Sequence, residues 1–151
     1  MRALHVLDIY DNTKSVPKIA NAMIRNFDGE NHIVADSGLI PSLKDIDVFG
    51  FDVIFLHSAI HAFGLRRFAS KMIHLYYGIQ PNWFRSYFLR HYVNEKLMAH
   101  RFKDIVTCSQ FLAEDYKKLY GRMPRVVQFG VDYERFQYKD PLQLPSDRYP
   151  V

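Results

Sequence analysis

A chain of 151 residues is long enough for one domain with its own hydrophobic core, or one domain and a short extension. Hydrophobic residues make up 48% and charged residues 24% of the chain, which excludes a disordered or fibrous protein. The single cysteine, Cys108, excludes an intrachain disulfide and a cysteine-based zinc site. The longest apolar run, residues 53–56, is too short for a transmembrane helix, and Asp8 interrupts the start before a signal-peptide core could form. We therefore expect a cytoplasmic protein.

The formal charge of +4 is unevenly distributed along the chain. The segment from His61 to Lys103 holds ten aromatic residues and one acidic residue, Glu95, against eight basic ones: Arg66, Arg67, Lys71, Arg85, Arg90, Lys96, Arg101 and Lys103. A basic segment rich in aromatic residues suits phosphate, an anionic membrane surface or nucleic acid. Nucleic acid is the weakest of these, because no DNA- or RNA-binding signature is present.

The first half of the chain alternates between strand and helix patterns. Residues 3–10 are almost continuously apolar, as in a central parallel strand. A helix is predicted from the capping residue Ser15, with apolar residues at helical spacing until Gly29 ends it. A short strand over 32–35 follows, and residues 38–50 are predicted to be mostly loop.

The second half continues the alternation as far as a proline-rich tail. The predicted elements are strand 51–57, helix 60–70, strand 72–77, a long helix 83–102, strand 105–108, helix 110–120 and strand 125–129. Ser109 is the expected cap of the helix over 110–120, and Gly121 its end. We predict one domain over residues 1–139, followed by a linker or tail over 140–151.

Alternating strands and helices predict an α/β fold, a Rossmann-like three-layer sandwich with a mostly parallel six-stranded sheet. The expected strand order is 3-2-1-4-5-6, with helices on both faces. Ligands of such folds bind beyond the carboxyl ends of the strands. Asn12, His57 and Tyr77 are predicted to lie at that edge.

Spacing excludes several common sites. No two glycines form Gly-x-Gly, and no Walker A sequence occurs, so dinucleotide-dependent and P-loop chemistry are not expected. His57 and His61 have metal-compatible spacing, but Ser58 stands where a zinc hydrolase has glutamate and no third ligand is evident. We expect no metal.

Several blocks of the sequence match a known pattern. Three blocks resemble a stretch of the retaining GT-B glycosyltransferases of family 4: residues 105–112 (Ile-Val-Thr-Cys-Ser-Gln-Phe-Leu), 116–121 and 126–136. The last block contains the sequence Gly-Val-Asp-x-x-x-Phe. Residues 52–58 resemble the Asp-x-Ile-His-x-His strand of the same family. Three positions depart from the family pattern: no glycine follows the first strand, Tyr77 replaces a frequent histidine, and Phe129 replaces an asparagine.

The resemblance implies an acceptor-binding half of a glycosyltransferase, which moves a sugar from a nucleotide-sugar donor to a carbohydrate or lipid-linked acceptor. It implies acceptor contacts by Asn12, His57 and Tyr77, and an interdomain cleft near Gly130 and Asp132. The nucleotide sugar would be a substrate and no cofactor is implied. A donor-binding domain would be supplied in cis or in trans, and no catalytic residue is assigned.

Plainer interpretations remain open. His57 could be a satisfied strand-end histidine, and Tyr77 could be a core residue. Trp83, Arg85 and Arg90 belong either to a core helix with solvated charges or to a surface that contacts phosphate or the inner face of a membrane. The alternative function is a non-enzymatic Rossmann-like module that binds phosphate, anionic membrane or nucleic acid through residues 61–103. We also expect either self-association through the 83–102 surface and the linker, or binding to a separate donor-domain chain or to a membrane.

Overall fold

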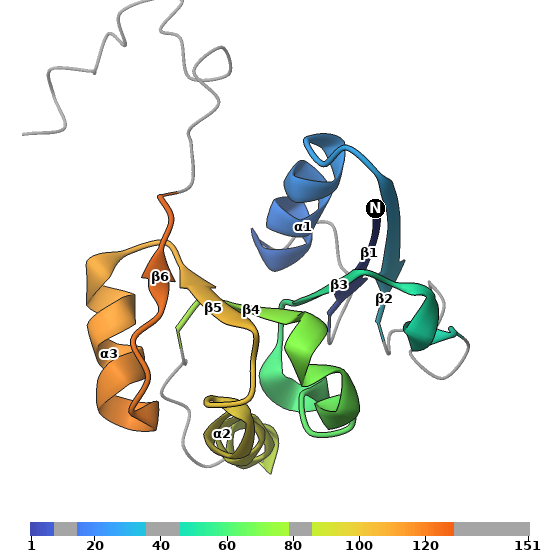
Figure 1. Ribbon diagram of the computed structural model, residues 1–151. Helices are drawn as coiled ribbons and strands as arrows, with labels where there is room; N and C mark the ends of the chain where they lie inside the picture. Colours follow the sequence, from blue (N-terminus) through green and yellow to red (C-terminus); the bar gives the residue numbers. More distant parts are fainter. Residues whose placement is uncertain (8–14, 36–45, 79–85, 129–151) are drawn as a thin grey trace, which may run out of the picture.

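Six parallel strands form the centre of the computed structural model, which describes residues 1–7, 15–35, 46–78 and 86–128 (Figure 1). The strands are β1 (Arg2–Val6), β2 (Glu30–Val34), β3 (Val53–Leu56), β4 (Met72–Tyr76), β5 (Asp104–Thr107) and β6 (Arg125–Val126). All five neighbouring pairs are parallel. The prediction of an α/β, Rossmann-like three-layer fold is confirmed. The predicted tail over 140–151 lies outside the described residues.

The predicted strand order is wrong in its first half. The observed order is β2-β1-β3-β4-β5-β6, so β1 pairs with β2 on one side and with β3 on the other. The composition of the strands explains the difference. β2 contains Glu30, Asn31 and His32 and is only partly buried, as suits the edge of a sheet, whereas the apolar β3 is largely buried between two neighbours.

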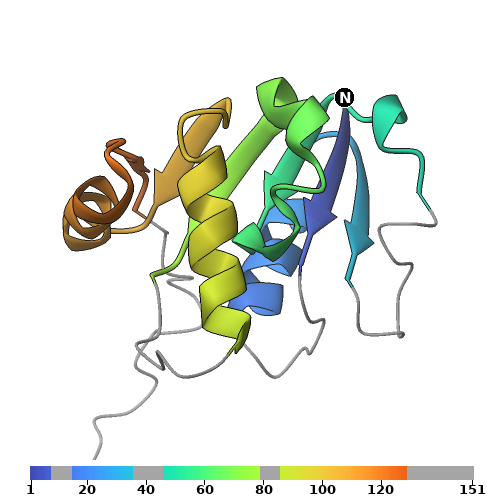
Figure 2. The same ribbon diagram turned by 90° about the horizontal axis from the view of Figure 1, so that it is seen from below.

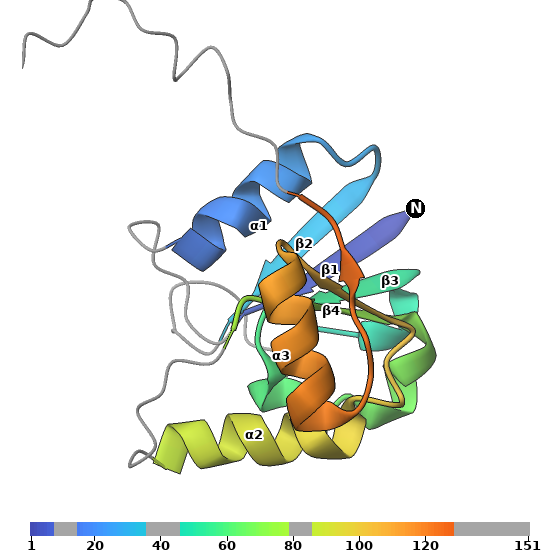
Figure 3. The same cartoon turned by 90° about the vertical axis from the view of Figure 1, so that its left-hand side faces the viewer.

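Helices cover both faces of the sheet. α1 (Ser15–Arg25) lies on one face, and α2 (Ser86–Met98) and α3 (Gln110–Tyr120) lie on the other (Figures 2 and 3). Right-handed crossovers explain this division: the chain moves one way from β1 to β2 and the opposite way from β3 through to β6.

The predicted helix over residues 60–70 is also wrong. The structure has two 3₁₀ helices there, η3 (Ala59–His61) and η4 (Arg66–Lys71), joined by turns. Gly64 in the middle of the stretch disfavours a continuous α-helix by roughly 1 kcal/mol relative to alanine. Phe63 and Gly64 are moreover exposed, so the connecting turn buries little that would offset this cost.

The later elements agree more closely with the sequence. The Ser109 hydroxyl accepts a hydrogen bond from the Leu112 N–H at the start of α3, and Gly121 ends α3 with a left-handed backbone at φ +81°. Both capping predictions are confirmed. α2 ends at Met98, earlier than predicted, and β6 comprises only two residues.

Alternation along the strands divides the interior into two cores. Leu4 and Val6 of β1 face the larger core, which also contains Ile54, Leu56 and the buried side chains of α2 and α3. Leu7 belongs to the smaller core beneath α1, with Ala20 and Ala35. Because His5 lies between Leu4 and Val6, its side chain projects to the α1 face of the sheet.

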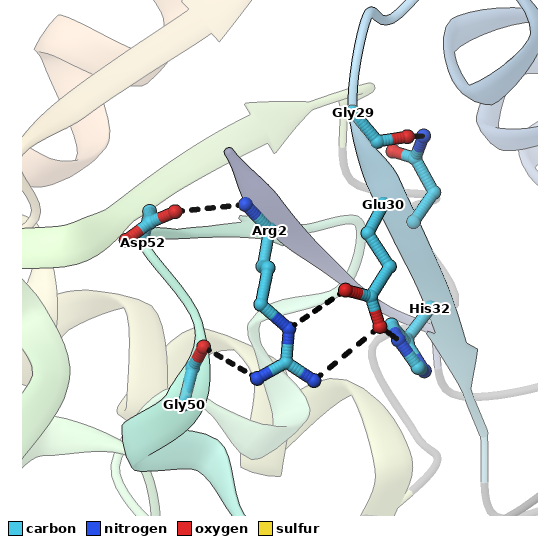
Figure 4. Close-up of polar contacts among 7 residues, drawn as sticks. Arg2, Gly29, Glu30, His32, Gly50 and Asp52 are labelled. Atoms are coloured by element: carbon cyan, nitrogen blue, oxygen red, sulfur yellow. Dashed lines mark hydrogen bonds and ion pairs between the residues drawn. The ribbon is translucent and has the colours of Figure 1, made fainter.

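Arg2 fastens the amino ends of three strands together (Figure 4). Its backbone N–H donates to the Asp52 carboxylate at 2.8 Å, and its guanidinium donates to the carboxylate of Glu30 and to the carbonyl oxygen of Gly50, both at 3.0 Å. The clamp therefore ties β1 to β2 and to the segment that enters β3.

Candidate functional site at the carboxyl ends of the strands

His57 and Tyr77 meet at the edge of the sheet where the sequence placed them. His57 directly follows β3, and its backbone N–H continues the pairing with β1 by donating to the Val6 carbonyl oxygen at 2.9 Å. Tyr77 directly follows β4. The Tyr77 hydroxyl lies 3.0 Å from His57 Nδ1, and the two rings are nearly parallel with centroids 6.2 Å apart. The pair thus joins the carboxyl ends of two neighbouring strands.

Two further residues extend this pair across the sheet. His57 Nε2 lies 3.1 Å from His5 Nδ1, and His5 Nε2 lies 3.4 Å from the side-chain oxygen of Asn31. We call the four residues Asn31, His5, His57 and Tyr77 the histidine chain. Its members come from β2, from β1, and from the ends of β3 and β4, which are four successive positions in the observed strand order.

Burial holds both histidines of the chain in the neutral form. It lowers the pKa of His5 to about 4, although the hydrogen bond with Asn31 acts in the opposite direction. It lowers the pKa of His57 to about 3, with smaller contributions from the charges of His5 and His74. Burial also raises the pKa of the Tyr77 hydroxyl. At neutral pH the side chains of the histidine chain are therefore polar but uncharged.

Packing holds the rings of the histidine chain in place. The His5 ring stacks on Phe55 with centroids 4.9 Å apart, and Phe27 meets the same Phe55 ring edge-on at 6.0 Å. His57 is only 5% exposed. An ordered and neutral group of this kind can direct a hydrogen bond, whereas it offers no positive charge to an anion.

Sequence reasoning missed His5 and Asn31. His5 carries a signal, because it is a histidine within an otherwise apolar strand, but its partner depends on which strands are neighbours. In the predicted order, β3 would lie at the edge of the sheet, separated from β4 by two strands. The observed order is what allows His57 to reach both His5 and Tyr77.

Most other predicted site residues lie outside the described residues: Asn12, Trp83, Arg85, Gly130 and Asp132. Arg90 belongs to α2, but its side chain is likewise not described. Their predicted roles stay predictions. Within the described ranges, no three His, Cys, Asp or Glu side chains gather in a way that could hold a metal ion.

A second buried histidine lies on the opposite face of the sheet. His74 Nε2 of β4 forms an ion pair of 2.6 Å with Glu95 of α2, and His74 Nδ1 donates to the Leu56 carbonyl oxygen at 3.0 Å. Burial disfavours the charged imidazolium, but the Glu95 carboxylate outweighs it and the pKa of His74 is raised. Both side chains are almost completely buried, so the pair joins α2 to the sheet from within the larger core.

The basic segment is spread over more than one surface. Arg66 and Arg67 are exposed just before β4, at the amino end of the sheet, and each guanidinium lies over a phenylalanine ring. On α2, three aliphatic side chains at four-residue spacing are exposed by 61%, 43% and 52%: Leu89, Val93 and Leu97. We call these three residues the α2 stripe.

Among the helices of the described ranges, none combines the length and the apolar character needed to cross a membrane. Comparisons of the chain with family models, with curated proteins and with solved structures find no match.

Proposed function

We propose that the chain is the acceptor-binding half of a GT-B glycosyltransferase, which moves a sugar from a nucleotide-sugar donor to a carbohydrate or lipid-linked acceptor. The donor-binding domain would act in cis or in trans. The observation that carries the proposal is the hydrogen-bonded pair of His57 and Tyr77 at the carboxyl ends of β3 and β4.

The position and chemistry of this pair support the proposal. Open α/β sheets bind their ligands beyond the carboxyl ends of the strands, and both residues follow a strand directly. A sugar hydroxyl can be recognised by a hydrogen-bonding group that is held in a fixed position, and the pair supplies the Tyr77 phenol, which the His57 imidazole holds in place. The resemblance of residues 52–58 to a glycosyltransferase strand concerns the same His57.

The contribution of this half to catalysis would be positioning. A glycosyl acceptor must present one hydroxyl to the anomeric carbon of the donor, and holding that hydroxyl in place removes much of the entropic barrier. With pKa values of about 3 and about 4, His57 and His5 are weak bases, so we assign them no proton abstraction.

Titration of the full chain with a panel of methyl glycosides, followed by NMR, tests the proposal. We expect shifts at His57 and Tyr77 with at least one glycoside, and at least tenfold weaker binding for His57→Gln and Tyr77→Phe. The control is His32→Gln, which lies on β2 and contacts Glu30 and Phe51. Absence of binding across the panel, or inorganic phosphate as the ligand that shifts these two residues, would contradict the proposal. Turnover of a nucleotide sugar by this chain alone would contradict the assignment of half an enzyme.

One observation favours the second candidate, a module that binds an anionic surface. The α2 stripe points away from the core, Lys96 and Arg101 near it are exposed, and Glu95 is buried on the opposite side of the helix. Aliphatic side chains flanked by cations suit the headgroup region of an anionic bilayer.

Flotation with vesicles of phosphatidylglycerol, compared with phosphatidylcholine, tests this second candidate. Leu97→Glu should abolish binding to the anionic vesicles, whereas Phe111→Glu should preserve it, because Phe111 is more exposed than Leu97 but lies on α3. Equal recovery with both lipids, or equal loss in both variants, would contradict it.

A further inference from the structure

We infer that the histidine chain has one fixed hydrogen-bond direction, set by Asn31 at the edge strand, and that His5 is a positioning residue that holds His57 as its Nε2–H tautomer. The direction runs from Tyr77, through His57 and His5, to Asn31. The role of this hydrogen-bond direction in binding a glycosyl acceptor rests on the proposed function, but the direction itself does not.

The direction begins at Asn31, whose amide makes two contacts. Its nitrogen donates to the Gly29 carbonyl oxygen at 3.0 Å, and its oxygen faces His5 Nε2 at 3.4 Å. Turning the amide over would set its oxygen against the Gly29 carbonyl oxygen, placing two acceptors together. The amide therefore has one orientation that satisfies both contacts, in which its oxygen accepts a hydrogen bond from His5.

The backbone of Gly29, which accepts the hydrogen bond from the Asn31 amide, is itself held in place. A Cβ at Gly29 would collide with the carbonyl oxygen of Met1, so the β2 backbone approaches the start of β1 closely there. The Glu30 N–H donates to that same Met1 carbonyl oxygen at 3.1 Å. Glu30 is also bound by Arg2, so the acceptor on which Asn31 depends is fixed by its neighbours (Figure 4).

Each following contact is then determined in turn. His5 donates from Nε2, so its Nδ1 in the neutral ring is an acceptor, and His57 must donate to it from Nε2. His57 Nδ1 is therefore also an acceptor, and the Tyr77 hydroxyl donates to it. The burial that keeps both rings neutral removes the alternative in which one histidine carries both protons.

This direction defines what the carboxyl-end site offers to a ligand. A phenol carries one proton, and Tyr77 has committed that proton to His57. Any additional partner of the Tyr77 oxygen must therefore donate a hydrogen bond, as a hydroxyl or an amine does. A ligand group that can only accept, such as a phosphate oxygen or an ether, finds no complementary contact on Tyr77.

Long-range ¹H–¹⁵N NMR of the histidine rings in the full chain at pH 7 tests the inference without any ligand. We expect His5 and His57 both to show a protonated Nε2 and an unprotonated Nδ1, the latter well downfield. Protonated Nδ1 in either ring, or doubly protonated rings, would overturn the inference. The glycoside titration can fail while this result holds, so the two failures are distinguishable.

Substitution of Asn31 tests whether this residue sets the hydrogen-bond direction of the histidine chain. Asn31→Leu removes the acceptor that faces His5 Nε2 and should produce a mixture of His57 tautomers. His32→Gln, the next residue of β2 but on its other face, should change neither ring. A His57 that remains entirely Nε2–H in Asn31→Leu would overturn the role of Asn31. If that variant does not fold, the tautomers of the unmodified chain still decide the matter.

Discussion

Buried histidines lie on both faces of the same sheet, and their pKa values are shifted in opposite directions on the two faces. On the α1 face, His5 and His57 bond to each other and to neutral partners, and burial lowers the pKa of both. On the α2 face, His74 meets a carboxylate at 2.6 Å, and its pKa is raised. All three rings are almost inaccessible to solvent. The partner therefore decides the protonation state, since burial alone would keep each ring neutral.

The largest expected effect on stability comes from breaking the buried ion pair of His74 and Glu95. Glu95→Ala leaves the buried His74 without its counter-ion, and losing one partner of a buried pair typically costs about 3–5 kcal/mol of unfolding free energy. Urea unfolding monitored by circular dichroism measures this. Glu114→Ala on the exposed side of α3 is the control and should change stability by less than about 0.5 kcal/mol. A cost below about 1 kcal/mol for Glu95→Ala would show that the pair is not charged.

A change of pH should alter the contributions of the two faces to the unfolding free energy in opposite directions. Lowered folded-state pKa values mean that the unfolded chain takes up protons first, so the contribution of His5 and His57 is present above about pH 6.5. It is lost as the pH falls toward 4 and then 3, by roughly 3 kcal/mol for His5. The contribution of His74 is present below pH 6.5 and is lost as the pH rises through its raised pKa.

Unfolding free energies at pH 7 and 4.5 measure this difference. His5→Gln should lose less stability on acidification than the unmodified chain, because the variant lacks one buried neutral histidine. His100→Gln, an exposed position just after α2, should follow the unmodified chain. An equal loss for His5→Gln and the unmodified chain would mean that His5 is not held neutral by the fold.

The smallest effects distinguish two adjacent tyrosines. Tyr76 donates to the Asp115 carboxylate at 3.1 Å on the α2 face, whereas Tyr77 contacts His57 on the α1 face. Tyr76→Phe and Tyr77→Phe should each cost about 1 kcal/mol of unfolding free energy. Only Tyr77→Phe should shift the ring resonances of His57 in NMR spectra. The same shift in Tyr76→Phe would mean that the two clusters communicate through the sheet.

Local patterns predicted much of the fold. The apolar segments marked all six strands, and the Ser109 and Gly121 signals located both ends of α3 because each acts through its nearest neighbours. The strand order failed because it depends on long-range pairing, although the polar residues of β2 already favoured the edge of the sheet. The predicted helix over 60–70 is wrong because the stretch folds as two short 3₁₀ helices on either side of Gly64, a residue that disfavours a continuous α-helix.

The candidate site was predictable in the same uneven way. His57 and Tyr77 could be proposed because each follows an apolar strand, and the carboxyl ends of parallel strands share one edge. His5 and Asn31 could not, because their contact requires β1 beside β2 in a known register. The ion pair of His74 and Glu95 depends on how α2 docks on the sheet, and no local pattern encodes that arrangement.

The histidine chain runs perpendicular to the strands, and this makes it a check on how they align. Side chains alternate between the faces of a strand, so sliding β1 by one residue would turn His5 toward Ile54 and Met98 and bring Leu4 or Val6 between Asn31 and His57. Such a misaligned sheet would bury an unsatisfied imidazole in one core and leave two polar groups without partners in the other. The four residues therefore penalise near-native misfolded sheets that apolar burial alone would tolerate, and they select a single alignment during folding.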